Sequence, residues 1–511
     1  MSAPATQGQR LPAGGPEREA LREKGQFWTP DWVAEAMVGY VLAGGSPDLF
    51  DPAVGAGVFF RAARRLGAAK GRVYSLSGAE LDPITLNEAL AGGLSAEDLQ
   101  SVQIADFVLA PPGRRVRAIV ANPPYIRHHR LPAGVKAELR HLGASLIGRP
   151  LDGRAGIHVY FLLRALQLLE PDGRLAFIVP ADTCEGVFAG ALWDWVSAKF
   201  RIEAVVTFAP EASPFPGVDT NPVILMIRRA PPRGQLAWAR CLRPSPPGLL
   251  AWAEGGLGAA AVEGFEAVPR DLGEAVRTGL SRPPASEAAS EQVLSDYVSV
   301  ARGIATGSNE FFLLTCSQAE ALGIPPEFLR PAVGRTRDVP GDEVTPETLR
   351  RLEEVGRPTC LLSLDGRPLE CFPPAVQDYI RQGERAGLPT RPLLATRRPW
   401  YRTEVRAVPP FLFAYLGRRN ARFVRNLAGV VPLTSFLCVY PHAADDLAVA
   451  RLWEVLRDPR TVANLALVGK SYGGGAIKVE PRALERLPLP AQGPSGADLP
   501  VPRVARQLAL W

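Results

Sequence analysis

Short apolar runs alternate with longer stretches of helical character through the first 230 residues of the chain. Strands are predicted at residues 48–50, 73–81, 102–106, 116–121 and 174–180. Helices are predicted around these runs, among others at residues 31–43, from 58 onward and at 156–169. Residues 202–208 and 223–228 then predict an antiparallel pair of strands that completes the sheet. The alternation is typical of a doubly wound, Rossmann-like α/β sheet.

The composition of the chain changes after this region. Proline pairs and a Ser/Pro/Ala segment interrupt a stretch that is rich in Ala, Gly and Pro and has weak periodicity. We therefore predict four segments: a flexible lead-in at 1–25, a first domain at 26–245, a loosely structured junction at 246–290 and a second, mixed α/β domain at 291–511.

Polar residues follow three successive predicted strands. The first strand runs into the Gly-rich turn Asp51–Gly57, whose backbone a ligand can approach closely and whose following helix favours negative charge. The second ends at Glu80, a position suited to accept hydrogen bonds from both hydroxyls of a ribose. The third precedes Asp106, which can accept an adenine amino proton, and Phe107, which can pack on the base. The crevice at this edge of the sheet is predicted to hold an adenosine derivative.

The tetrapeptide Asn122-Pro123-Pro124-Tyr125 ends the strand predicted at 116–121. The Asn122 side chain offers a carbonyl oxygen, and Pro123 offers a main-chain carbonyl on a backbone stiffened by the proline pair. Tyr125 adds a flat ring beside them. Two acceptors and a stacking surface suit a planar substrate with an amino group, which favours methylation of an exocyclic amine. A plain Asn-Pro turn is the alternative interpretation of these four residues alone.

Two basic zones stand out in a chain whose net charge is +6. Residues 390–426 hold nine arginines and one acidic residue. Residues 114–140, which bracket the Asn-Pro-Pro-Tyr turn, hold seven basic residues and one acidic residue. A basic zone around the presumed reaction site favours a polyanionic substrate, although each zone alone also fits a solvated surface.

Other sequence features narrow the class of protein. The six cysteines are scattered and include no close pair with metal-ligand spacing, so no metal site is predicted and the thiols are expected to be reduced. The polar residues 1–25 do not resemble a secretory signal peptide, and no apolar run approaches the ~20 residues that span a bilayer. We therefore expect a cytoplasmic protein without a membrane partner.

The order of these motifs resembles the gamma-class DNA adenine methyltransferases, the TaqI-like enzymes that use S-adenosylmethionine (AdoMet). In that family a Thr-Pro segment precedes the glycine turn, as Phe27-Trp28-Thr29-Pro30 does here, and the turn matches residues 51–57. The segment 213–225 resembles the part of the family that carries a second aromatic residue, here Phe215. Four later segments resemble target-recognition domains: residues 301–314, 395–401, 432–435 and 470–481.

The resemblance implies a site-specific DNA adenine-N6 methyltransferase of a restriction–modification system, which flips an adenine out of double-stranded DNA. The catalytic residues implied are Asn122, Pro123, Tyr125 and Phe215. The AdoMet-binding residues implied are Thr29, Pro30, Asp51, Ala53, Gly55, Gly57, Glu80, Asp82, Asp106 and Phe107. The DNA contacts expected in the second domain are Arg397, Arg398, Arg402, Arg418, Arg419, Arg422, Arg425 and Lys470.

Three alternatives share part of this pattern. Enzymes that methylate a protein glutamine amide also carry an Asn-Pro-Pro-Tyr turn, but they are typically shorter and lack a large basic C-terminal domain. Methylation of RNA is a second alternative, and a DNA-recognition subunit without catalysis is a third, although every motif that a cofactor needs is present. No nuclease-like Asp…Glu-x-Lys constellation stands out after residue 290, so a cognate restriction endonuclease is expected in a separate chain.

Overall fold

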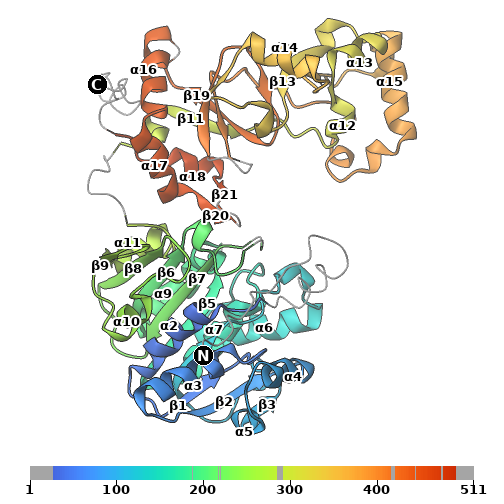
Figure 1. Ribbon diagram of the computed structural model, residues 1–511. Coiled ribbons are helices and arrows are strands. Elements are labelled where there is room, and N and C mark those ends of the chain that lie inside the picture. Colours follow the sequence, from blue (N-terminus) through green and yellow to red (C-terminus); the bar gives the residue numbers. More distant parts are fainter. Residues whose placement is uncertain are drawn as a thin grey trace. The chain divides into compact units, whose positions relative to one another are not determined.

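The computed structural model describes residues 27–186, 188–216, 218, 220–284, 292–415, 421–443, 445–472 and 476–490. The chain divides into two compact units, residues 1–284 with 472–475 and residues 285–471 with 476–511, and Figure 1 labels many of their elements.

The first unit is built on a ten-stranded sheet in the order β3-β2-β1-β4-β5-β7-β6-β8-β10-β9. Its strands are β1 Asp48–Asp51, β2 Ser75–Glu80, β3 Val102–Ile104, β4 Val116–Ala121, β5 Leu169–Pro180, β6 Arg201–Phe208, β7 Pro222–Arg228, β8 Gln235–Cys241, β9 Ala260–Val262 and β10 Phe265–Asp271. Strands β3, β2, β1, β4 and β5 pair in parallel, whereas β7 pairs antiparallel with both β5 and β6. The predicted doubly wound α/β fold is confirmed, and so is the antiparallel pair.

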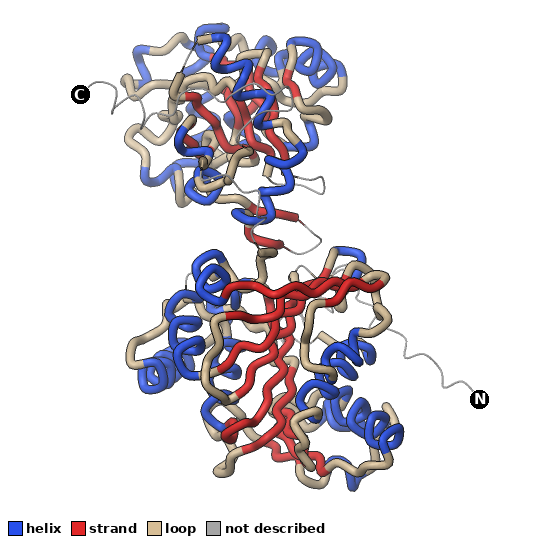
Figure 2. The backbone as a smooth tube through the Cα atoms, turned by 90° about the vertical axis from the view of Figure 1, so that its left-hand side faces the viewer, coloured by secondary structure: helices blue, strands red, loops and turns tan. Residues whose placement is uncertain are grey.

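Helices cover both faces of this sheet, as Figure 2 shows. The helices α2 Asp31–Leu42, α3 Val58–Lys70 and α10 Leu249–Glu254 share one hydrophobic core, and α6 Ala133–Ile147, α7 Ile157–Leu168, α9 Ala189–Lys199 and α11 Leu272–Thr278 share the other. Other helices of the unit are α4 Ile84–Ala91, α5 Ala96–Leu99 and α8 Asp182–Glu185.

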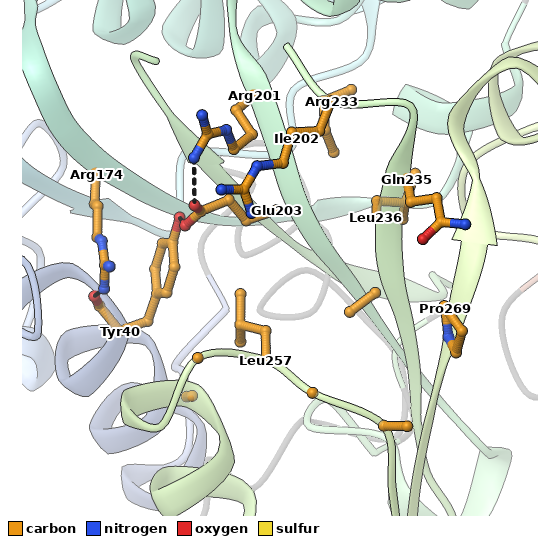
Figure 3. A pocket seen from close by; sticks show the side chains of 15 residues that line it. Tyr40, Arg174, Arg201, Ile202, Glu203, Arg233, Gln235, Leu236, Leu257 and Pro269 are labelled. Carbon is orange, nitrogen blue, oxygen red and sulfur yellow. Dashed lines mark hydrogen bonds and ion pairs between the residues drawn. The ribbon is translucent and has the colours of Figure 1, made fainter. Parts of the chain in front are cut away.

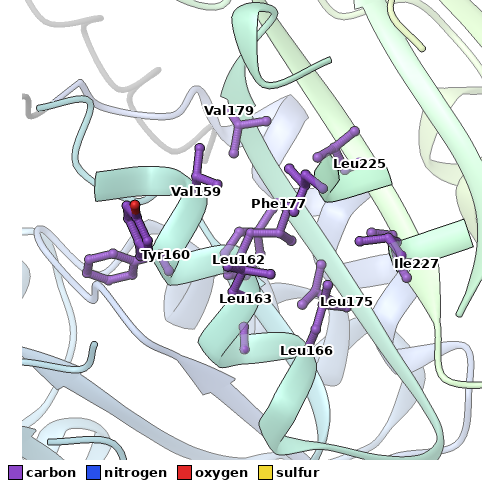
Figure 4. Packing of buried hydrophobic residues seen from close by; sticks show 14 of the residues in the cluster. Val159, Tyr160, Leu162, Leu163, Leu166, Leu175, Phe177, Val179, Leu225 and Ile227 are labelled. Carbon is purple, nitrogen blue, oxygen red and sulfur yellow. The ribbon is translucent and has the colours of Figure 1, made fainter. Parts of the chain in front are cut away.

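The central strand β5 shows why helices cover both faces of the sheet. Its side chains alternate between the two cores, with Phe177 and Val179 on the α7 side and Ala176 and Ile178 on the α2 side. Figure 4 shows the α7 side, where Leu163 and its neighbours on the helix pack against the β5 and β7 side chains. Each fully buried aliphatic or aromatic side chain of this kind stabilises the fold by roughly 1.5–3 kcal/mol.

The expectation of a loosely structured junction at 246–290 is wrong for residues 246–284. These residues form α10, β9, β10 and α11, and β10 pairs with β8 from Phe265 to Asp271. The sheet therefore does not end with β6 and β7 but continues through three more strands. Small residues hid this pattern in the sequence, because the buried positions of β10 alternate as Phe265 and Ala267 and carry little hydrophobic contrast. The remaining junction residues, 285–290, lie outside the described part of the chain.

The second unit is mixed α/β, as predicted, and holds a five-stranded sheet β11-β19-β16-β17-β14, a four-stranded sheet β12-β15-β13-β18 and the pair β20-β21. Its strands are β11 Val298–Arg302, β12 Leu313–Leu314, β13 Leu329–Val333, β14 Glu343–Val344, β15 Cys360–Leu362, β16 Phe411–Ala414, β17 Arg422–Asn426, β18 Val431–Pro432, β19 Phe436–Pro441, β20 Lys470–Tyr472 and β21 Ala476–Lys478. Its helices are α12 Asn309–Phe312, α13 Cys316–Ala321, α14 Pro346–Glu354, α15 Pro374–Arg385, α16 Asp446–Leu456, α17 Pro459–Val468 and α18 Pro481–Glu485.

The fold brings together two cysteines that are far apart in the sequence. The Sγ atoms of Cys316 and Cys360 lie 2.8 Å apart, and both residues are free thiols of intermediate burial. Among the described residues, no helix is long and apolar enough to span a membrane.

Candidate active site

The Asn-Pro-Pro-Tyr turn and the glycine turn meet at one edge of the sheet. Asn122 follows the carboxyl end of β4, and residues 52–57 follow the carboxyl end of β1. The two strands are parallel neighbours, with Phe50 paired with Ile119. The motifs that the sequence separates by about 65 residues are therefore adjacent in the structure, as the order of predicted strands required.

The side chain of Asn122 is held in one orientation by its amino group. Its Nδ2 atom donates to the carbonyl oxygen of Phe27 at 2.5 Å and to Oγ1 of Thr29 at 3.1 Å. A main-chain carbonyl can only accept, so the Nδ2 atom must face Phe27 and the Oδ1 atom must face away. Within the described residues, neither Oδ1 of Asn122 nor the carbonyl oxygen of Pro123 receives a hydrogen bond. The turn thus presents two acceptors that no group of the described residues uses.

Three aromatic rings gather beside this turn. Tyr125 and Phe215 lie edge to face with ring centroids 6.2 Å apart, and Phe27 lies 5.6 Å from Tyr125 and 5.9 Å from Phe215. The Tyr125 hydroxyl donates to the carbonyl oxygen of Ile178 on β5, and burial raises its pKa well above the usual value, so the phenol stays protonated. The structure brings the two predicted stacking residues together in one packed cluster.

Sequence reasoning missed two residues of this cluster. Phe27 supplies both a ring and the carbonyl oxygen that orients Asn122. His158, at the beginning of α7, is 4% exposed, and its ring meets Tyr125 edge to face at 6.1 Å. Neither of its ring nitrogens has a hydrogen-bond partner among the described residues, and burial lowers its pKa, so the imidazole is neutral. The only sequence signal for Phe27 was its place in the Thr-Pro segment; His158 had none.

The glycine turn depends on its backbone conformation. Gly55 and Gly57 have positive φ angles of 51° and 76°, a region that favours glycine, and a Cβ on Gly57 would lie 2.4 Å from a Leu94 methyl carbon. The amide of Gly55 donates to Oε2 of Glu80 at 2.8 Å. The predicted ribose acid is therefore also the residue that fixes the turn.

The carboxylate of Glu80 already accepts several hydrogen bonds from backbone amides of the chain. Its Oε1 atom accepts from the amides of Leu81 and Asp82, both at 2.9 Å, in addition to the bond between Gly55 and Oε2. A carboxylate offers about four acceptor positions, so about one remains. Three backbone amides therefore use most of the acceptor positions of the predicted ribose acid.

Asp51, at the beginning of the glycine turn, has one carboxylate oxygen without a hydrogen-bond partner among the described residues. The residue is fully buried, and its Oδ1 atom accepts from the amide of Ala53 at 2.9 Å. Its Oδ2 atom has no hydrogen-bond partner among the described residues. Burial raises the pKa of Asp51 to about 8. An acceptor in this state is expected to bind a donor that the chain does not supply.

The adenine site predicted after the third strand consists of two neighbouring residues, Asp106 and Phe107. Asp106 uses Oδ1 to accept from the amides of Val108 and Leu109 and is half-buried at the end of β3. Phe107 is 1% exposed and packs between Phe50 and Phe161, at centroid distances of 5.9 and 5.4 Å. Phe107, which we predicted to pack on the base, therefore belongs to the hydrophobic core of the first unit.

Two other predicted cofactor residues have local roles. Pro30 is the residue before α2, and its carbonyl oxygen accepts from the amides of Val33 and Ala34. Asp82 accepts from the amide of Ile84 through Oδ1 and so shapes the turn after β2.

The arginines predicted to contact DNA differ in exposure. Arg397 donates to the carbonyl oxygens of Ala305 and Thr306, and Arg422 donates to those of Val339 and Gly341 and pairs with Asp342. These two guanidinium groups support their own unit, and their contact with DNA stays a prediction.

The other predicted contacts are less constrained or cannot be placed. Arg398 is exposed and donates to the carbonyl oxygens of Ala395 and Arg397. Arg402 is exposed and Arg425 is half-buried. Arg418 and Arg419 lie outside the described residues, and Lys470 is described only as the first residue of β20.

A separate cavity of about 280 Å³ in the first unit lies away from these motifs. It opens at the beginnings of β6 and β8, where Arg201 and Gln235 line it, together with Tyr40, Arg174 of β5 and Glu203 (Figure 3). This is the amino edge of the parallel strands, opposite the carboxyl edge that carries both motifs. Tyr40 donates to Glu203 at 2.9 Å, and Arg174 lies over the Tyr40 ring at 5.2 Å, so much of the lining is already paired.

The fold and the Asn-Pro-Pro-Tyr site define the class of protein, and sequence comparison agrees with them. Residues 17–233 match the family model for the N-6 DNA Methylase. With the relatives described below, this match makes the chain an N6-adenine DNA methyltransferase.

Its particular subgroup follows from the second unit. Residues 285–508 match the C-terminal domain of the type II methyltransferase M.Eco57I, so the chain is a restriction–modification methyltransferase of type II. It is 23% identical to the type II methyltransferase M.AccI of Acinetobacter calcoaceticus, over 92% of this chain and 85% of that protein. It is 26% identical to M.XamI of Xanthomonas campestris pv. amaranthicola, over 91% of this chain and 85% of that protein.

One solved structure has a similar fold across both units. It is the type IIL restriction–modification enzyme MmeI in complex with DNA, with a TM-score of 0.50 and 13% sequence identity. The match covers 94% of this chain and 64% of that one.

Proposed function

We propose that the chain methylates the N6 atom of an adenine that is flipped out of double-stranded DNA at one specific sequence. The orientation of Asn122 carries this proposal. Its Oδ1 atom and the carbonyl oxygen of Pro123 are two acceptors that no group of the described residues uses, and an exocyclic amine has two N–H donors to place on them.

The two acceptors address the main obstacle of the reaction. The lone pair of an adenine amino group is delocalised into the ring, which makes the nitrogen a poor nucleophile. Hydrogen bonds from both N–H groups to Asn122 and Pro123 favour a tetrahedral nitrogen and stabilise the positive charge that develops on it. Tyr125 and Phe215 offer aromatic surface, and each stacking contact with a base contributes roughly 1–3 kcal/mol against the cost of flipping.

The carboxyl edge of the sheet fits AdoMet, which when bound supplies the activated methyl group. The unpaired, buried Oδ2 of Asp51 suits the ammonium of the methionine moiety, and the remaining acceptor position of Glu80 suits a ribose hydroxyl. The second oxygen of Asp106 suits the adenine amino group. Thr29 lies against Asn122, so we assign it to the orientation of the catalytic amide as well as to the cofactor crevice.

Target recognition belongs to the second unit in this proposal, and cleavage of unmodified DNA belongs to a separate restriction endonuclease. We infer that the enzyme acts in the cytoplasm, where its DNA substrate lies.

Long-read sequencing that detects methylated adenine tests the proposal. DNA from a methylation-deficient host that expresses the wild type should carry methylated adenine at one recurrent motif, and DNA from a host that expresses Asn122→Ala should not. Absence of methylated adenine in the presence of folded wild-type protein would contradict the proposal.

A further inference from the structure

A groove within the second unit has no role in the function described so far. Its volume is about 460 Å³, and it lies between the loop 305–310 and three side chains from distant segments, Arg335, Arg391 and Thr434. None of these three residues was among the DNA contacts expected from the sequence.

The loop that forms one wall of the groove is held rigidly. Arg397 donates to the carbonyl oxygens of both Ala305 and Thr306, and Oγ1 of Thr306 donates to Oδ1 of Asn309 at 2.6 Å. Gly307 has a φ angle of 81°, and a Cβ at this position would lie 2.8 Å from a Leu394 carbon. Binding groups on this loop are therefore preorganised and lose little conformational entropy when a ligand binds.

Hydrogen-bond donors dominate the inner surface of the groove. Arg391 donates to the buried Oγ of Ser308 at 3.0 Å, which aims its guanidinium at the loop and leaves other N–H groups free. Arg335 is exposed and makes no side-chain hydrogen bond or ion pair within the described part of the chain. The carbonyl of Asn309 is taken by Thr306, so its amino group is the part that remains to bind a ligand. Glu310 is the one carboxylate among the described lining residues, so two arginines and one glutamate give a net charge of +1.

A lining of this kind suits a ligand that only accepts hydrogen bonds and carries negative charge. Base edges in the major groove present both donors and acceptors, whereas the non-bridging oxygens of a phosphodiester only accept. We infer that this groove binds a phosphodiester group of the DNA backbone and so fixes the position of the duplex on the second unit without reading its sequence. The inference rests on the proposed function, because it assumes that the second unit binds DNA.

Salt-dependent binding of the full-length protein tests the assignment. Duplexes of equal length, one with the recognition motif and one with a scrambled sequence, are titrated between 50 and 200 mM salt. The variants are Arg335→Ala, Arg391→Ala and Asn309→Ala, and the control is Arg381→Ala on α15, which removes the same charge from an exposed residue of the same unit. Circular dichroism establishes that each variant is folded.

Each arginine variant should bind both duplexes more weakly by the same factor, roughly tenfold. The slope of log K against log salt should fall by about one unit, while the methylated motif stays the same. The Arg381→Ala control should bind as the wild type does. Arg335 makes no internal hydrogen bond, so its variant tests the groove even if Arg391→Ala fails to fold.

Unchanged affinity and slope in the folded Arg335→Ala variant would overturn the inference. A loss confined to the cognate duplex, or an altered methylation motif, would overturn it in favour of base reading. Failure of the wild type to bind either duplex would instead remove the proposed function, so the two failures are distinct.

Discussion

The two units use their polar side chains in different ways. In the first unit, hydrogen bonds to Phe27 and Thr29 occupy the amino group of Asn122 and leave its carbonyl oxygen free at the carboxyl edge of the sheet. In the second unit, hydrogen bonds to carbonyl oxygens of the same unit occupy Arg397 and Arg422. In both places the bonds fix the orientation of the side chain. The atoms that remain unpaired then determine what the side chain can still bind.

The largest expected effect removes the free acceptor itself. Asn122→Ala should lower kcat by about 10²–10³, the usual loss when one group that stabilises a transition-state charge is removed. Affinity for AdoMet should stay within a few-fold, because Asn122 is not part of the glycine turn. Single-turnover methylation of a cognate duplex gives the rate, and calorimetry gives the affinity. Near-normal turnover would show that the amide carbonyl has no catalytic role.

The second effect concerns the unpaired oxygen of Asp51. Its pKa of about 8 in the free protein means that it is largely protonated at pH 7, whereas a bound ammonium favours the carboxylate and lowers that pKa. AdoMet binding should therefore release a proton below pH 8. The affinity should rise by up to about tenfold per pH unit toward pH 8 and level off above it.

Calorimetric titrations from pH 6 to pH 9 measure this dependence. Asp51→Asn serves as the control, since it keeps the shape of the side chain but has no titrating proton. A wild-type affinity that does not vary with pH would contradict the assignment of Asp51 to the ammonium.

A third effect tests the structural use of arginine in the second unit. Arg397→Ala leaves two carbonyl oxygens without their donor and should lower the free energy of unfolding of this unit by about 1–3 kcal/mol. Arg402→Ala, at an exposed position nearby, should change it by less than about 0.5 kcal/mol. Urea denaturation followed by tryptophan fluorescence compares the two. Equal stabilities would mean that Arg397 is not a structural residue.

The smallest effect concerns one of the two bonds that orient Asn122. Thr29→Val removes Oγ1 without changing the size of the side chain, and loss of one such bond should reduce kcat by about fivefold to tenfold. Thr29→Ser keeps the hydroxyl and should restore the rate. If valine and serine behave alike, the bond from Phe27 alone is sufficient to orient the amide.

The sequence determined the class of fold, the order of the motifs and the chemistry of the catalytic turn. Strand periodicity and the proline pair are local properties of the chain. The carboxyl ends of β1 and β4 and the stiff backbone at Pro123 could therefore be predicted without the tertiary structure. It also determined that Gly55 and Gly57 form a turn, because few other residues adopt their positive φ angles.

The tertiary structure alone decided which atoms are free. Burial of Phe107 between Phe50 and Phe161, the bond from the Gly55 amide to Glu80 and the bonds from Arg397 to Ala305 and Thr306 all depend on neighbours that are distant in the sequence. The strands after residue 230 were hidden for a related reason, since small residues such as Ala267 pack well only against partners that the chain supplies elsewhere. Residue type shows what a side chain can bind, but packing decides whether that capacity is already used.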